Sequence, residues 1–145
     1  MSKQPKQPTA EETVNALVLE SRVLENTYNE LTARQNILER ALIESRAALD
    51  AIKGLAEGSS KEVLTQIGGG AILRSAPPSI DKVMLGVGAG IVIEKPRAEA
   101  VAILEERTKE YERTLMSIVN QRNEIAERLE SDRQVLNTIL SQSQE

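Results

Sequence analysis

Two glycine clusters are the segments of this 145-residue chain whose residue types could form a nucleotide site. Residues 86–90 read Gly-Val-Gly-Ala-Gly, whereas a dinucleotide site needs G-x-G-x-x-G between a strand and a helix that receives the phosphates. A strand-like run follows this cluster instead of a helix. The cluster at 68–70 lacks the Lys-Ser/Thr pair of a phosphate-binding P-loop. Glycines that form turns are therefore the better interpretation of both clusters.

The other groups able to do chemistry are carboxylates. The chain has 22 Asp and Glu against 18 Lys and Arg, a formal net charge of -4, and no His or Cys. Thiolate and imidazole chemistry, disulfides and zinc fingers are thereby excluded. The carboxylates stand beside opposite charges at helical positions, as Glu105 with Lys109 does, which is typical of a solvated helix face. We therefore expect no enzyme activity, no metal site and no cofactor.

Composition also limits the partners and the compartment. A mildly acidic chain with two Tyr and no Phe or Trp lacks the basic stripe and the stacking rings of a nucleic-acid binder. No apolar run approaches the roughly 18 residues that a membrane span needs, and no signal peptide opens the chain. We expect no nucleic acid and no membrane as partner, and a cytoplasmic location. The scarcity of aromatic residues also favours a narrow helical seam over a thick core.

Two heptad patterns flank the glycine-rich middle. In residues 9–57, Thr9 and Glu12 form a candidate capping box, and seam positions then recur at alternating spacings of three and four from Val14 onward. The same pattern runs through residues 98–142. Both continue over several heptads, which predicts two coiled-coil helices of about 65 Å each. Residues 1–8, with two prolines, are expected to form a disordered tail, and residues 143–145 a frayed end.

Polar seam residues select one antiparallel register between the two patterns. In the register that sets Ser45 opposite Thr108, Ser21 also lies opposite Asp132. A shift by one heptad sets Ser45 against an apolar residue, and an unpaired buried polar group costs about 1–3 kcal/mol. The pattern therefore predicts an intramolecular antiparallel coiled coil in this register. The alternative is that each helix pairs with another chain.

Two layers of this register are mismatched. Arg122 lies opposite Leu31, and Gln35 lies opposite Ile118. We expect the long polar side chains of these layers to reach outward from the narrow seam.

The helical periodicity ends in residues 58–97, and six of the eight glycines lie between positions 68 and 90. Short β-branched runs at 63–67, 71–74, 80–85 and 91–94 are separated by the glycine clusters and by a Pro-Pro pair at 77–78. This predicts two β-hairpins whose turns need positive φ. Isolated hairpins bury little apolar surface and leave open edges, so we expect them to oligomerise. The expected oligomerisation residues, most of them partly exposed in an isolated chain, are Val63, Ile67, Ile72, Val83, Leu85, Ile91 and Ile93.

The order of these segments resembles one known family. Two long helices flank a double hairpin, in which KVMLGVGAGIVIEK at 82–95 leads directly into a helix at AEAVAILEER. The segment KEVLTQIGGGAILRSA at 61–76 is similar to that family's first hairpin. Over nearly its whole length the chain resembles the α-class subunit of prefoldin. The implied fold is mostly α with small β, a long antiparallel coiled-coil hairpin whose helices are joined by two β-hairpins that oligomerise into a β-barrel body.

The resemblance also implies a function and a set of partners. Prefoldin of this kind is an ATP-independent molecular chaperone, a holdase of two α-class and four β-class subunits built on an α–α dimer. The implied partners are therefore prefoldin β subunits, a second α subunit, non-native polypeptides and a group II chaperonin that receives them. Two alternatives stay open from the residues alone. One is a filament or scaffold that assembles through its hairpins without a holdase role, and the other is a coiled-coil adaptor whose head only dimerises.

The helix ends remote from the hairpins carry the candidate substrate contacts, because the predicted coiled coil brings both chain ends together there. Exposed aliphatic residues on a fraying element can adapt to many sequences, as a promiscuous binder requires. Some candidates belong to the seam, namely Val14, Leu17, Leu136 and Ile139. The others lie off the seam and should be at least partly exposed: Val18, Leu19, Val23, Val135 and Leu140.

Overall fold

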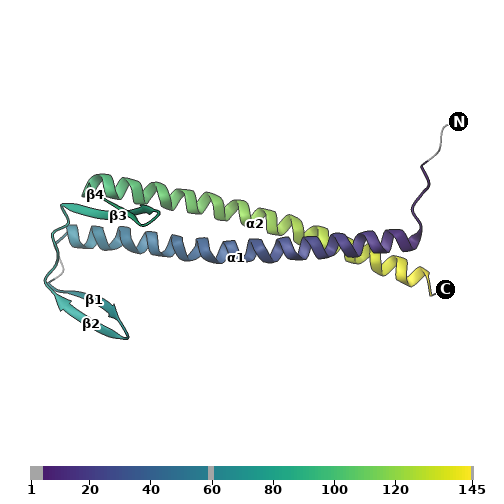
Figure 1. Ribbon diagram of the computed structural model, residues 1–145, viewed down its shortest axis with the longest axis horizontal. Helices are drawn as coiled ribbons and strands as arrows, with labels where there is room; N and C mark the ends of the chain where they lie inside the picture. The colour runs from purple at the N-terminus through teal and green to yellow at the C-terminus, as the bar shows by residue number, and fades with distance from the viewer. Residues whose placement is uncertain (1–4, 59–60, 145) are drawn as a thin grey trace. The chain divides into compact units, whose positions relative to one another are not determined.

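The computed structural model describes residues 5–58 and 61–144. Two long helices are joined by two small antiparallel hairpins, which confirms the predicted fold class (Figure 1). The elements in chain order are α1 (Ala10–Ala56), β1 (Val63–Gly68), β2 (Ala71–Ser75), β3 (Lys82–Gly88), β4 (Ile91–Pro96) and α2 (Arg97–Gln142). Of the predicted disordered tail, residues 1–4 lie outside the described residues and 5–8 form no helix or strand. Ser59, Ser60 and the last residue of the predicted frayed end also lie outside them.

The first helix begins at the predicted capping box. The backbone N–H of Thr9 donates to Glu12 Oε2 at 2.8 Å, and the backbone N–H of Glu12 donates to Thr9 Oγ1 at 3.2 Å. Two N–H groups that the first helical turn leaves without an internal partner are thereby satisfied. Glu11 and Glu12 also place negative charge in the first turn, where the helix dipole favours it.

The chain divides into two compact units. The terminal unit comprises the described residues up to Leu38 and those from Thr114 onward, and thus contains both chain ends. The hairpin unit comprises residues Glu39–Arg113, with both β-hairpins. Each helix contributes residues to both units.

In the hairpin unit the two helices of one chain pair in the predicted register. Ser45 Oγ lies 2.7 Å from Thr108 Oγ1, and both residues are buried. The Thr108 hydroxyl also donates to the carbonyl oxygen of Leu104 at 2.8 Å, so the buried polar layer is satisfied. At the surface of the same stretch, Arg46 Nη2 and Glu112 Oε1 form an ion pair at 2.7 Å. A polar layer of this kind fixes the register of a coiled coil.

The second hairpin, β3–β4, packs against the helices of its own chain. Leu85 forms a core with Ala100 and Leu104 of α2, and Val83 and Ile93 pack against the same core. The expectation that Leu85 stays partly exposed is wrong, since only 6% of it is accessible. The cause is strand alternation, because Val83, Leu85 and Ile93, the residue paired with Leu85, lie on one face of the hairpin. That face meets the helices.

Two polar contacts join this hairpin and the residue before it to the N-terminal part of α2. The Nη2 group of Arg107 donates to the carbonyl oxygen of Gly86 at 2.7 Å. The backbone N–H of Arg97 donates to the carbonyl oxygen of Asp81 at 3.0 Å. Two details differ from the prediction. Strand β3 begins at Lys82 rather than at residue 80. Gly86 pairs with Val92 inside the ladder instead of belonging to the turn.

Both hairpin turns use the positive φ that the glycines were expected to supply. In the first turn φ is 107°, 59° and 81° at residues 68–70, and in the second it is 105°, 50° and 73° at residues 88–90. Ala89 is the one residue other than glycine with positive φ among the described residues, and this conformation costs an L-residue roughly 1–2 kcal/mol. The glycines at 68–70, 88 and 90 are therefore turn residues, whereas Gly86 belongs to the strand ladder.

Candidate functional site

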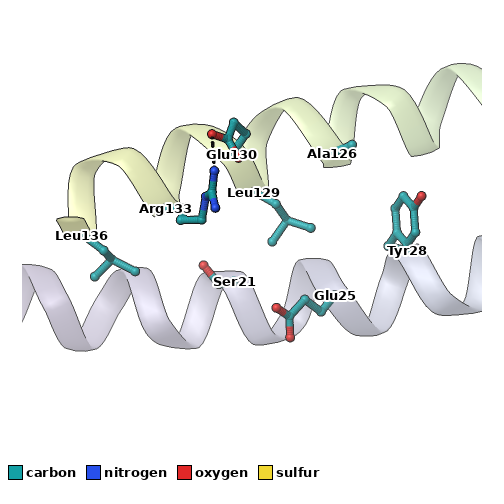
Figure 2. A pocket seen from close by; sticks show the side chains of 8 residues that line it. All are labelled: Ser21, Glu25, Tyr28, Ala126, Leu129, Glu130, Arg133 and Leu136. Carbon is teal, nitrogen blue, oxygen red and sulfur yellow. Dashed lines mark hydrogen bonds and ion pairs between the residues drawn. The ribbon is translucent and has the colours of Figure 1, made fainter.

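An open groove of about 540 Å³ lies between α1 and α2 in the terminal unit. Figure 2 shows Leu129 and Leu136 pointing from α2 toward α1, with Ser21 on the facing helix between them. Ala126 also lines the groove, and the small side chains of Ser21 and Ala126 leave the space unfilled. Glu130 and Arg133 form an ion pair at 2.8 Å on its border, and the Arg133 hydrogen bond and charge lower the pKa of the Glu130 carboxyl. The groove is therefore lined by the apolar side chains of Leu129 and Leu136 and by charged side chains from both helices, Glu25 of α1 and the Glu130–Arg133 pair of α2.

The seam layer next to this groove is built around an arginine. Arg122 Nη2 donates to the Tyr28 hydroxyl oxygen at 2.8 Å, Arg122 Nη1 donates to Gln35 Oε1, and the guanidinium lies 4.6 Å from the centre of the Tyr28 ring. The expectation that the long polar side chains of these layers reach outward is wrong. Arg122 is half-buried in the seam, and it joins the residues that flank the buried Leu31. The predicted register places Arg122 opposite Leu31, and Arg122 lies in that layer.

Asp132 has a different partner from the one predicted. It is 2% exposed, and its Oδ1 lies 3.3 Å from Arg128 Nε, one turn earlier on the same helix, in place of the expected Ser21. Arg128 also forms an ion pair with Glu20 across the seam at 2.8 Å. The hydrogen bond and charge of Glu20, and then the charge of Asp132, raise the pKa of Arg128. Asp132 Oδ2 is buried without a hydrogen-bond partner among the described residues.

Replacing Asp132 with leucine should stabilise the terminal unit. A buried carboxylate that is only half satisfied is destabilising relative to an apolar side chain of similar size, by about 1–4 kcal/mol. Arg128 would keep Glu20 as its partner, so the substitution leaves no cation buried and unpaired. Thermal unfolding followed by circular dichroism should give a higher midpoint for Asp132→Leu than for the wild type. A lower midpoint would mean that the carboxylate is a net stabilising group.

The candidate substrate contacts divide by exposure as predicted from the heptads. The seam residues Val14, Leu17, Leu136 and Ile139 are only partly exposed. The off-seam residues, here called the terminal patch, are Val18 (43% exposed), Leu19 (61%), Val23 (63%), Val135 (43%) and Leu140 (53%). These five side chains are exposed near the two helix ends and do not belong to the packed seam.

The candidate oligomerisation residues fall into two groups. Val83, Leu85 and Ile93 pack within the chain, as described above. Ile67, Ile72 and Ile91 are exposed and Val63 is partly exposed. Sequence reasoning missed further exposed apolar residues of the hairpins: Leu64, Leu73, Met84, Val87 and Val92. The alternation of side chains along each strand is the signal that could have assigned Met84 and Val92 to the face opposite Leu85 and Ile93.

Among the described residues, no group of three or more carboxylate, His or Cys side chains could hold a metal ion. Nor does any helix in the described part of the chain have the length and apolarity to cross a membrane.

Comparison with known proteins places the chain in a family. A family model described as "Prefoldin subunit" matches residues 24–142. The chain belongs to the prefoldin family. The prefoldin subunit alpha of Nitrosopumilus maritimus is 29% identical over 136 residues, which cover 94% of each chain. That of Methanoculleus marisnigri is 32% identical over 108 residues, which cover 70% of this chain and 72% of the relative.

A solved structure has the same fold. The filamentous PFD from Methanocaldococcus jannaschii superposes with a TM-score of 0.63 at 24% sequence identity, covering 81% of this chain and 95% of that one. Prefoldin subunits are chaperones and not enzymes, and they assemble with other prefoldin subunits. The expectation of a non-enzymatic prefoldin-type chaperone subunit is therefore confirmed.

Proposed function

We propose that the chain is an α-class subunit of an ATP-independent holdase, which binds non-native polypeptides at the terminal patch and delivers them to a group II chaperonin. The observation that carries this proposal is the concentration of exposed aliphatic side chains near both helix ends of a prefoldin-family chain. A client segment that covers such side chains removes apolar surface from water, which is worth about 25 cal/mol per Å².

The groove beside the terminal patch supports the same role. Its apolar side chains, Leu129 and Leu136, offer a site for one client side chain, while its charged side chains stay in contact with water. Binding of this kind needs no fixed client sequence, because aliphatic contacts are not directional. The seam residues Val14, Leu17 and Ile139 would join the contact surface where the helix ends separate.

Assembly through the hairpins supports the other half of the proposal. Two-stranded sheets are marginally stable by themselves, and the exposed residues of β1–β2 and of the outer face of β3–β4 are available to other subunits. We propose a complex of two α-class and four β-class subunits, built on an α–α dimer whose hairpins contribute to a β-barrel body. Its place of action would be the cytoplasm, where newly made chains meet the chaperonin.

The test is suppression of aggregation in the absence of nucleotide. The chain, mixed with a β-class prefoldin subunit, should reduce the light scattering of a diluted denatured protein at near-equimolar ratios, and added ATP should change nothing. Scattering that is unaffected, or reduced only with ATP, would overturn the proposal. Native mass spectrometry of the same mixture should give a complex of two α and four β subunits. Open-ended polymers would instead support a filament, and a bare dimer an adaptor.

A further inference from the structure

The charges that line the groove of the terminal unit do not balance. Glu130 is paired with Arg133 at 2.8 Å, so these two charges neutralise each other. Glu25 lines the groove from α1, and its carboxylate has no hydrogen-bond or ion-pair partner among the described residues. Figure 2 shows Glu25 between Ser21 and Tyr28, on the helix that faces α2. The groove therefore keeps one uncompensated negative charge, which is exposed to water.

A second carboxylate in the same unit lacks part of its positive partner. Asp132 is buried, and its Oδ2 has no hydrogen-bond partner among the described residues. Arg128, which contacts Asp132 Oδ1, is shared with Glu20, so these three side chains together carry one net negative charge. Asp132 stands within one helical turn of Glu130 and Arg133, and salt screens charges only over about 10 Å at 0.1 M. Both observations indicate a negative potential at the groove, which favours a cation.

The apolar side chains of the groove narrow the choice of cation. Leu129 and Leu136 point toward α1, and the volume of about 540 Å³ lies within the range of roughly 300–1,000 Å³ that is typical of ligand pockets. A fitting occupant has an apolar stem for the leucines and a positive end for Glu25. The lysine side chain combines a four-carbon stem, which lies along apolar surface, with an ammonium that stays near water. The ammonium is a point charge without the planar geometry of a guanidinium, which suits a carboxylate that no neighbour holds in place.

We propose that the groove binds lysine side chains of non-native polypeptides, with the stem on Leu129 and Leu136 and the ammonium next to Glu25. Client segments in which a lysine lies among aliphatic residues are then preferred, because the aliphatic neighbours can cover the terminal patch at the same time. This inference rests on the proposed function, since it names the client chemistry that the terminal unit favours.

Two peptides that differ by one charge test the ammonium contact. Both are unstructured, have a blocked N-terminus and carry a single lysine flanked by leucines, and in one of them the lysine is acetylated, which removes the charge and keeps the stem. Fluorescence anisotropy with the complex reconstituted with β-class subunits, at low salt, should give a Kd about three- to fivefold lower for the lysine peptide, the effect of one exposed ion pair. Glu25→Gln should remove this difference by weakening the binding of the lysine peptide alone. The matched control Glu30→Gln changes an exposed carboxylate of α1 in the same unit that does not line the groove, and it should keep the difference.

Zero-length crosslinking locates the same contact. A carbodiimide joins a carboxylate to an amine only where the two groups touch, so it should link the peptide lysine to Glu25 and not to Glu30. Mass spectrometry of the digested complex identifies the linked residues.

Three outcomes would overturn the inference. Equal affinities of the wild-type complex for the two peptides would show that the ammonium makes no contact. A difference that persists in Glu25→Gln would place the contact elsewhere, and an equal loss in Glu30→Gln would show a general attraction to negative charge. In each case, suppression of aggregation by the same complex would still support the proposed holdase function, so the two failures can be told apart.

Discussion

Replacing the five residues of the terminal patch with serine should abolish suppression of aggregation without preventing assembly. Each aliphatic side chain that a client covers contributes roughly 1 kcal/mol or more, so their joint loss should weaken client binding by at least about a hundredfold. The residues lie off the seam and are exposed, which means that the coiled coil does not depend on them for packing. Light scattering of a diluted denatured protein measures the loss, and native mass spectrometry of the reconstituted complex measures assembly.

The terminal unit offers matched controls for this experiment. Ile37 and Met116 lie outside the terminal patch, and each is 69% exposed. Ile37→Ser and Met116→Ser remove apolar surface of the same kind from the same unit and should keep full activity. Equal loss of activity in these controls would show that general surface apolarity, and not the patch, captures clients. Failure of the patch variant to assemble would show that the patch is structural.

Truncating Leu85 to alanine should destabilise the hairpin unit by about 2–5 kcal/mol. The side chain is 6% exposed and packs against Ala100 and Leu104, so its removal leaves a cavity where β3–β4 meets α2. Because Val83 and Ile93 pack against the same core, we also expect the hairpin to detach from the helices and assembly with β-class subunits to be lost. Denaturant unfolding measures the stability, and native mass spectrometry measures the assembly.

The neighbouring residue is the control for this substitution. Met84 lies on the opposite face of β3 and is 72% exposed, so Met84→Ala should change the free energy of unfolding by no more than about 0.5 kcal/mol. If Leu85→Ala is as mild as Met84→Ala, the packing of the hairpin on its own helices does not stabilise the folded chain.

The helical part of the fold could be predicted from the sequence because spacing alone specifies a heptad seam. The polar pair Ser45–Thr108 then fixed the register, since one wrong heptad leaves a hydroxyl buried against an apolar residue. The burial of Leu85 could not be obtained in the same way. Alternation along β3 separates the two faces of the strand, but which face meets a helix depends on how the hairpin folds back, and that is a tertiary property.

The polar residues of the terminal unit show a second limit of what the sequence predicts. The ion pair of Asp132 with Arg128 has the i,i+4 spacing that is favourable on a helix, so the sequence did contain this signal. The inward position of Arg122 had no such signal. It depends on Tyr28 and Gln35, which both contact the guanidinium of Arg122. Pairing each seam residue with a single residue of the facing helix does not predict a contact among three side chains. The terminal patch was predictable because exposure off the seam follows directly from the heptad.

The most direct test of the proposed client contact is site-specific photo-crosslinking in the reconstituted complex. A photoreactive residue in place of Leu19, in the terminal patch, should crosslink to a bound denatured protein, whereas the same residue in place of Ile37 should not. Both positions are on α1 in the terminal unit and have similar exposure, 61% and 69%. Crosslinking at position 37 with none at position 19 would contradict the assignment of client binding to the helix ends.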